Sequence, residues 1–461
     1  MGRITISRKR AASLALVGCA CVGIAAAGAL LSGEGRVKVY DQDGNAVAEL
    51  YMENDELQYD CPDGYEAYFD LVRNEVIDIV MEEEQADRES AIKKIVSDGF
   101  EIRTGFSEKA MEGILEAYDK TPDPGMGNSA VVVSDTKGCI TASYSTSSDG
   151  QNYNYVNMPA YAGSSIKPLS VYAPALENGV IDWSSLYRDS PYAMVENESG
   201  QMTEWPVNTQ PYTEQMVTVE EAVATSNNAV AVKVLKDYGA QRSCDFLKDS
   251  FGIATEKEQE TIQEKGEDRV LSNLALGYLE EGVTVRQMAG AYQIFANGGF
   301  YYTPHTITEI EADDGEYYTS SGKEVRVVSE ETAYITNRLM RGVVLNGTGT
   351  SAQIEGIDVC GKTGTSDYGD HWFAGITPEY VCTVWYEEVS EGSTTDSSVQ
   401  IFHDVIEALE PSEDAAYPTA ENVYEMQYCR ESGLLRGSSC QNIGTGYYAG
   451  NNMPETCNKC K

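Results

Sequence analysis

The sequence predicts a mixed α/β domain, of the α+β type, in which one β-sheet lies between layers of helices. Two strand-like runs, at 130–133 and 139–144, flank a turn early in the chain, and a long helical block follows them. Further strand-like runs come late in the chain, at 325–328, 359–362, 372–376 and 381–386. This order of a hairpin, a helical block and a late group of strands favours a single sheet with helices on both faces.

The stretch before the hairpin predicts a smaller unit of strands and helices. Residues 34–60 are typical of a strand, a turn and a second strand that reaches Leu50. Residues 63–96 carry apolar side chains at helical spacing and acidic side chains on the remaining face, which indicates amphipathic helix. A short alternating strand at 100–104 precedes a second amphipathic helix over 107–119, whose first residue, Ser107, is the expected N-cap.

The helical block is expected to begin at Ser164. Pro168 falls in the first turn of this helix, where a missing N–H costs nothing, whereas Pro174 falls in its interior and is expected to kink it. Further helices are predicted at 219–238, with an interruption near Ser226, at 244–251 and at 285–296.

Two linkers rich in turn-forming residues, at 122–125 and 411–419, divide the chain. We therefore expect four parts: an N-terminal segment over 1–33, an accessory region over 34–121, a main domain over 125–410 and a cysteine-rich tail over 411–461. The formal net charge of −40 argues against nucleic-acid binding, which needs a basic face. An anionic ligand would have to be captured by local cations.

The first 33 residues predict a membrane anchor. Basic residues at positions 3, 8, 9 and 10 precede the uncharged stretch 11–31, which is long enough to cross a bilayer. The basic flank is expected to stay inside, which makes the chain a single-pass protein of the cell membrane with its bulk outside. A cleaved secretory signal and a lipoprotein cleavage site at Cys19 remain open as alternatives, and both also place the bulk outside.

The cysteines are unevenly placed. Four of the eleven lie in the last 33 residues, namely Cys429, Cys440, Cys457 and Cys460. In an extracellular segment with little core of its own, this favours disulfide staples, although the pairing cannot be derived. A four-cysteine zinc site is the less favoured alternative, because only one pair has the Cys-x-x-Cys spacing. The other cysteines beyond residue 33 are expected to be small buried residues: Cys61, Cys139, Cys244, Cys360 and Cys382.

Candidate catalytic residues begin with Ser164 and Lys167, a spacing that puts both side chains on one face of a helix. A serine hydroxyl is a poor nucleophile unless a base accepts its proton, and a lysine can do so once burial and nearby cations lower its pKa. The same spacing also begins at Ser90, Ser134 and Ser320, so the pair is weak evidence alone.

Two further motifs follow downstream of this pair. Ser226-Asn227-Asn228 is the only Ser-x-Asn in the chain, and Lys362-Thr363-Gly364 is the only Lys-Thr-Gly. Ser-x-x-Lys, Ser-x-Asn and Lys-Thr-Gly, in this order, form the signature of penicillin-recognising serine enzymes. The chain resembles the transpeptidase domain of penicillin-binding proteins over roughly 97–410, including the segments 295–299, 347–350 and 372–375. The resemblance implies a five-stranded antiparallel sheet between two helical layers.

The resemblance implies a role for each motif residue. Ser164 would attack a D-alanyl-D-alanine-like amide, and Lys167 would accept its proton. Ser226 would relay a proton to the departing nitrogen; its alternative interpretation is a helix cap. Asn228 can both donate and accept, which suits holding an amide of the substrate.

The Lys-Thr-Gly strand would complete the site. Lys362 would favour a neutral Lys167 and attract the terminal carboxylate, to which Thr363 and Thr365 would offer hydroxyl groups. Gly364 would let the substrate approach the backbone closely. The resemblance implies an oxyanion hole made by the backbone N–H groups of Ser164 and Thr365, and it implies no cofactor and no metal.

The function that follows is a peptidoglycan D,D-transpeptidase that cross-links stem peptides and is acylated by β-lactams at Ser164. A D,D-carboxypeptidase, a β-lactam hydrolase or sensor, and an inactive scaffold of cell-wall synthesis remain alternatives. In bifunctional relatives a glycosyltransferase follows a strand like the one at Tyr40, but here that domain looks excised between about residues 55 and 62. We therefore expect no glycan polymerisation and a separate glycan polymerase as partner.

Overall fold

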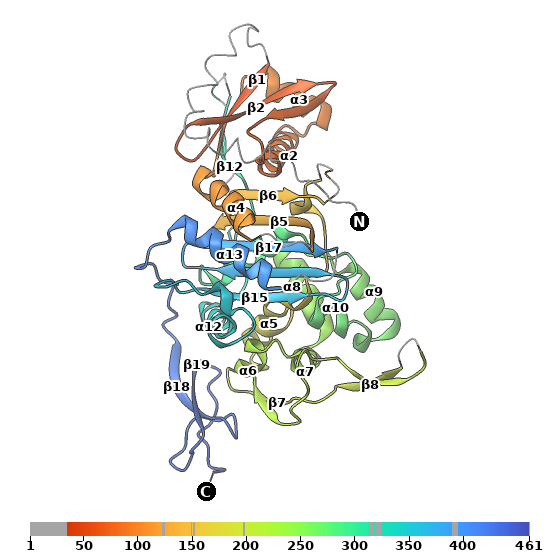
Figure 1. Cartoon of the computed structure of the whole chain (residues 1–461), viewed down its shortest axis with the longest axis vertical. Coiled ribbons are helices and arrows are strands. Elements are labelled where there is room, and N and C mark those ends of the chain that lie inside the picture. The colour runs from red at the N-terminus through yellow and green to blue at the C-terminus, as the bar shows by residue number, and fades with distance from the viewer. Residues whose placement is uncertain are drawn as a thin grey trace, which may run out of the picture.

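A computed structural model of the protein describes residues 35–121, 125–148, 150, 153–196, 199–312, 315, 317–319, 324–389 and 395–460. The molecule is elongated, with a small sheet at one end, a central sheet between helices in the middle and a hairpin at the other end (Figure 1). Within the described residues, no helix is both long and apolar enough to cross a membrane. The predicted anchor, residues 1–33, lies outside the described residues.

The central sheet has five strands in the order β15-β16-β17-β5-β6. Each neighbouring pair is antiparallel, which confirms the expected sheet. Every residue of β16 is buried. Because helices cover both faces of this strand, residues 372–376 form an unbroken apolar run in the sequence. The bounds of the strands are β5 Met126–Asp135, β6 Ile140–Thr146, β15 Cys360–Thr365, β16 Asp370–Ile376 and β17 Tyr380–Glu388.

One predicted strand of this sheet is wrong. The run at 325–328 yields only β14 (Val325–Arg326), which pairs with β11 (Phe300–Tyr301) outside the central sheet. Both β14 residues are exposed, and only Val328 at the end of the run is buried, so the run forms no strand with a continuous apolar face.

Helices cover both faces of the central sheet (Figure 1). On one face α4 (Glu108–Lys120) packs against α13 (Thr395–Leu409), where a Cβ on Gly113 would lie 3.0 Å from the Cβ of Ala408. As predicted, Ser107 caps α4 by accepting a hydrogen bond from the N–H of Ala110. The helical block has the bounds α5 Ala173–Glu177, α6 Val219–Ala224, α7 Asn228–Tyr238, α8 Ala240–Phe251, α9 Glu256–Lys265, α10 Leu271–Leu276, α11 Val285–Tyr292 and α12 Glu330–Asn346.

The small sheet at the N-terminal end draws strands from two distant parts of the chain. Its order is β13-β12-β4-β1-β2-β3, so two strands from beyond residue 300 complete a sheet begun by the first 104 residues. The single helical stretch expected over 63–96 is broken at Gln85, which adopts a left-handed conformation with φ 49° and ends the first helix. The bounds are β1 Arg36–Tyr40, β2 Ala46–Glu53, β3 Glu56–Asp60, α2 Glu66–Glu84, α3 Arg88–Ser97, β4 Glu101–Thr104, β12 Ile307–Glu311 and β13 Tyr317–Tyr318.

Two small ribbons and the tail complete the fold. The ribbons lie between α5 and α6 and have the bounds β7 Leu186–Arg188, β8 Ala193–Glu196, β9 Met202–Trp205 and β10 Met216–Thr218. The tail is a hairpin of β18 (Val423–Cys429) and β19 (Ile443–Ala449), and β19 contacts α12.

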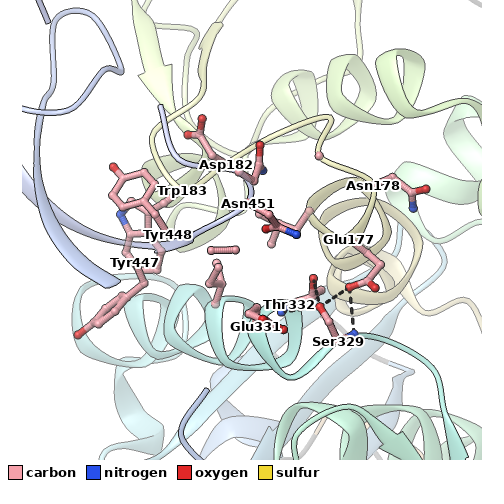
Figure 2. Close-up of a pocket in the computed structure, with 15 residues that line it drawn as sticks. Glu177, Asn178, Asp182, Trp183, Ser329, Glu331, Thr332, Tyr447, Tyr448 and Asn451 are labelled. Carbon is pink, nitrogen blue, oxygen red and sulfur yellow. Dashed lines mark hydrogen bonds between the residues drawn. The ribbon is translucent and has the colours of Figure 1, made fainter. Parts of the chain in front are cut away.

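The tail and the helical block together line an open pocket of about 350 Å³ (Figure 2). Trp183, Thr332 and Tyr447 line it, so the loop after α5, helix α12 and the tail all contribute. The hydroxyl of Tyr448 lies 2.7 Å from the hydroxyl of Ser184, a contact that ties the tail to the loop after α5.

Candidate active site

Ser164 and Lys167 lie on a tight turn at the start of the helical block. Gly163–Ile166 form a 3₁₀ turn, in which residues three apart lie above one another. One turn of π-helix over Pro168–Tyr172 follows, and α5 begins only at Ala173. Helical backbone thus continues without a break from Gly163 to Glu177, as expected, with a π turn directly before Pro174, while the kink at this proline stays a prediction.

Close backbone packing joins this turn to strand β15. Gly163 has φ +54°, and a Cβ there would lie 2.4 Å from the carbonyl oxygen of Thr365. A Cβ on Gly364 would lie 2.4 Å from the carbonyl oxygen of Ala162. A glycine is therefore needed at 364 for close packing within the protein, whereas the sequence predicted that it makes room for the substrate. This packing places the backbone of Thr365 next to the turn that carries Ser164.

Lys167 is fully buried and its amine is held in one place. The Nζ atom donates to the carbonyl oxygen of Ser226 at 2.9 Å and to Oδ1 of Asn228 at 2.6 Å. Burial, and to a smaller extent the charge of Lys362, hold the pKa of Lys167 well below its usual range. A neutral amine has two N–H bonds and one lone pair, so these two acceptors leave its lone pair to take a proton.

Lys362 is the second buried lysine of the site. Its Nζ donates to the hydroxyl of Ser226 at 2.8 Å and to the carbonyl oxygen of Thr363 at 3.0 Å. Burial lowers the pKa of Lys362 to about 7. The hydroxyl of Thr363 lies 2.6 Å from that of Thr348, so the 347–350 loop supports the Lys-Thr-Gly strand.

Ser226 joins the two lysines through an unusual backbone conformation. It lies between α6 and α7 with φ 57°, the left-handed region that serine rarely adopts. Its carbonyl oxygen accepts from Lys167 and its hydroxyl accepts from Lys362. The N-cap of α7 is Asn227, whose side chain accepts from the N–H of Val230, so the helix-cap interpretation of Ser226 is wrong.

The structure therefore brings the three predicted motifs together. They lie on the 3₁₀ turn at Ser164, on the turn between α6 and α7 at Ser226, and on strand β15 at Lys362. Ser164 is half-buried and Thr365 is exposed, so both can be reached from solvent, while Lys167 and Lys362 lie beneath them. The other Ser-x-x-Lys matches lie elsewhere: Lys93 on α3 pairs with Glu89, Lys137 is exposed in the turn after β5, and 320–323 are outside the described residues.

A buried carboxylate that the sequence analysis missed holds the Ser-x-Asn turn. Asp189 accepts from the side chains of Asn227 at 2.8 Å and Asn208 at 2.9 Å, and from the N–H of Thr213 at 2.8 Å. Burial acts to raise the pKa of Asp189, but these hydrogen bonds outweigh it and lower the pKa. Oδ1 of Asn208 in turn accepts from the N–H of Asn228 at 2.9 Å. Nothing local in the sequence marks Asp189, because its partners come from separate loops.

His371 and Trp372, which follow the Lys-Thr-Gly motif on the neighbouring strand β16, contact other residues of the protein. The ring of His371 stacks on Tyr386 with ring centroids 4.8 Å apart and lies 3.3 Å from the carboxylate of Glu388. Trp372 is fully buried, and its indole N–H donates to the carbonyl oxygen of Tyr161, which anchors the loop before Ser164.

Comparison with known proteins identifies relatives over most of the chain. The family model of the penicillin binding protein transpeptidase domain matches residues 128–407. Penicillin-binding protein 1F of Bacillus subtilis is 30% identical over 324 residues, which are 67% of this chain and 42% of that protein. Penicillin-binding protein 1A of Streptococcus oralis is 30% identical over 349 residues, which are 70% of this chain and 52% of that protein. The chain thus spans about half the length of these relatives, or less.

Solved structures share the fold. The D,D-transpeptidase domain of a peptidoglycan glycosyltransferase from Eggerthella lenta superposes with a TM-score of 0.60 at 20% identity, covering 82% of this chain and 98% of that one. Penicillin-binding protein 1A from Haemophilus influenzae superposes with a TM-score of 0.67 at 17% identity, covering 88% of this chain and 78% of that one. The matched family model and the shared fold lead to one conclusion: the chain belongs to the family of penicillin-binding protein transpeptidases.

Proposed function

We propose that this protein is a peptidoglycan D,D-transpeptidase that works through an acyl-enzyme on Ser164. The observation that carries the proposal is the buried amine of Lys167, one 3₁₀ turn from Ser164. In its neutral form, both of its N–H groups have acceptors in Ser226 and Asn228. Its lone pair is then the remaining group that can take the Ser164 proton.

The first half of the reaction acylates the enzyme. Ser164 Oγ attacks the carbonyl carbon of the penultimate D-alanine, and its proton passes to Nζ of Lys167. The backbone N–H groups of Ser164 and Thr365 would stabilise the oxyanion, and losing one such donor typically costs ~3 kcal/mol. The C–N bond then breaks, and the proton held on Lys167 passes through the hydroxyl of Ser226 to the departing amine, which leaves Lys167 neutral again. Lys362 contacts this hydroxyl at 2.8 Å.

The second half transfers the acyl group. The amine of a second stem peptide attacks the ester carbon and loses a proton to Lys167. The C–O bond to Ser164 then breaks, and Ser164 Oγ takes that proton from Lys167, which restores the hydroxyl and the neutral amine. Lys362, Thr363 and Thr365 would hold the carboxylate of the donor. A local cation is needed there because the chain as a whole carries a net charge of −40. A bound carboxylate would also raise the pKa of Lys362 and keep it charged.

The proposal also covers where the protein is located and which reaction it does not carry out. Residues 1–33 would anchor the chain in the cell membrane with the catalytic domain outside. The chain would carry out no glycosyl transfer, because a turn of only a few residues separates β3, which ends at Asp60, from α2, which begins at Glu66. A separate polymerase would then supply the glycan strands.

A donor–acceptor assay tests the proposed reaction. The full chain is incubated with a peptide that ends in D-alanyl-D-alanine and with an amine acceptor, and free D-alanine and the joined product are measured. We expect both from the wild type and from Ser90→Ala, which alters a Ser-x-x-Lys match outside the site, and neither from Ser164→Ala. D-alanine release without a joined product would assign a carboxypeptidase instead, and activity retained in Ser164→Ala would refute the acyl-enzyme.

A further inference from the structure

The four cysteines of the tail meet in one cluster at its far end. Cys429 ends β18, Cys440 lies in the loop before β19, and Cys457 and Cys460 follow β19. The four sulfur atoms all lie within 4.8 Å of one another, and Cys460 alone of the four is not fully buried. Residues up to 31 positions apart thus direct their sulfur atoms at a common point.

The spacing of the sulfur atoms differs from that of disulfides. A disulfide needs two sulfur atoms about 2.0 Å apart, whereas the sulfur of Cys460 lies 3.4 Å from that of Cys429 and 3.7 Å from that of Cys457. Four thiolates bound to one zinc ion at about 2.3 Å in a tetrahedron are separated by about 3.8 Å. The disulfide staples favoured by the sequence are therefore absent among these cysteines, all of which are free.

Backbone contacts hold the cluster together. The N–H of Gly437 donates to the sulfur of Cys440 at 3.3 Å, a contact that stabilises a thiolate. Leu435 accepts from the N–H of Cys457 at 2.7 Å and donates to the carbonyl oxygen of Glu455 at 3.0 Å. The two loops that carry the cysteines are thus paired with each other through backbone hydrogen bonds.

Around the cysteines themselves, the end of the tail has only a small apolar cluster. The buried cysteines Cys429, Cys440 and Cys457 form a cluster separate from the main hydrophobic core. Among the described residues, those that pack against it as half-buried apolar residues are Leu434, Ile443 and Cys460. So small a core cannot offset the conformational entropy of ordering the loops around it. A bound metal ion is the usual source of folding energy for such a module.

We propose that Cys429, Cys440, Cys457 and Cys460 bind one zinc ion that folds the end of the tail. Four cysteine thiolates fill all four positions of a tetrahedral zinc ion and leave none for a substrate, so this would be a structural site and not a catalytic one. This metal site goes beyond the proposed function, does not depend on it and departs from the sequence prediction of no metal.

The position of the tail links the metal site to the catalytic domain. Tyr428, next to Cys429, donates its hydroxyl to the carboxylate of Glu220 at 2.6 Å, and Arg430 donates to Glu221 at 2.8 Å. Both acids belong to α6, the helix that leads directly into Ser226. A folded tail therefore supports helix α6, which positions Ser226, and acts on the site through this helix.

Metal analysis of the full chain tests the site. The protein is purified without chelators or immobilised metal, and its zinc content is measured by elemental analysis. We expect about one zinc per chain in the wild type and in Cys61→Ser, which alters a half-buried free cysteine of the N-terminal region, and a loss of zinc in Cys440→Ser. Removing the zinc from the wild type with a chelator is expected to make the tail sensitive to protease, a readout that does not require the variant to fold.

Two outcomes would overturn the proposal. The first is a metal-free wild type whose denatured chain, without reductant, lacks four titratable thiols, since that result would assign disulfides. The second is zinc retained in full by Cys440→Ser. Reconstitution with Co²⁺ gives an independent check, because tetrahedral thiolate coordination produces visible absorption bands, and their absence would exclude a four-sulfur site.

Discussion

Replacing Lys167 with methionine is expected to slow acylation of Ser164 by a β-lactam by about 10²–10⁴-fold, the usual contribution of a positioned general base. Lys167 is buried, its pKa is well below its usual range because of burial and the nearby Lys362, and its N–H groups bind Ser226 and Asn228. Methionine is similar in length and fits a buried position, but it offers no lone pair of comparable basicity. The measurement is the rate at which fluorescent penicillin labels the protein.

A matched control separates catalysis from folding. Lys93→Met removes the lysine of another Ser-x-x-Lys match, on the surface of α3, and is expected to leave the rate unchanged. Lys167→Met also leaves two acceptors without a donor, at a cost of roughly 1–3 kcal/mol for each, so its thermal melting is measured alongside. A folded Lys167→Met protein that is acylated within a few-fold of the wild-type rate would rule out Lys167 as the base.

Replacing Lys362 with methionine is expected to change the pH dependence of acylation. Acylation needs a neutral Lys167, so the wild-type rate rises as pH rises through the pKa of Lys167. The charge of Lys362 helps to keep that pKa low, although burial is the larger cause. Without this repulsion the pKa of Lys167 rises, and the acidic limb of the pH–rate profile moves to higher pH.

The same profile has a direct control. Lys236→Met removes an exposed lysine that pairs with Asp268 on the surface, and its acidic limb should coincide with that of the wild type. The acylation rate is measured for all three proteins across the pH range in which Lys362, with a pKa of about 7, changes its charge. An acidic limb that stays in place or moves to lower pH in Lys362→Met would show that the two lysines do not interact as described.

The sequence predicted those features that depend on short-range patterns. The strands of the central sheet stand out because their apolar runs are short and are bounded by turns, as around β5 and β6. The Ser164, Ser226 and Lys362 motifs could be found because each is a fixed spacing of few residues, and their order in the chain separated them from accidental matches such as Ser90.

Features that depend on distant parts of the chain could not be predicted. Asp189 was missed because its three partners are brought to it only by folding. The contact between Gly364 and Ala162 was missed for the same reason, so the glycine was assigned to the substrate. The cysteine cluster was assigned to disulfides because spacing alone does not tell four ligands of one ion from two pairs.

The proposed mechanism depends on Ser164 becoming a nucleophile beside the buried amine of Lys167, in a site that Ser226 and Lys362 complete. Peptide mapping of the full chain after incubation with a β-lactam tests this claim most directly. We expect one adduct, on the peptide that contains Ser164, with a lifetime of minutes to hours, and no adduct in Ser164→Ala. An adduct on another residue, an adduct that survives in Ser164→Ala, or one hydrolysed within milliseconds would contradict it.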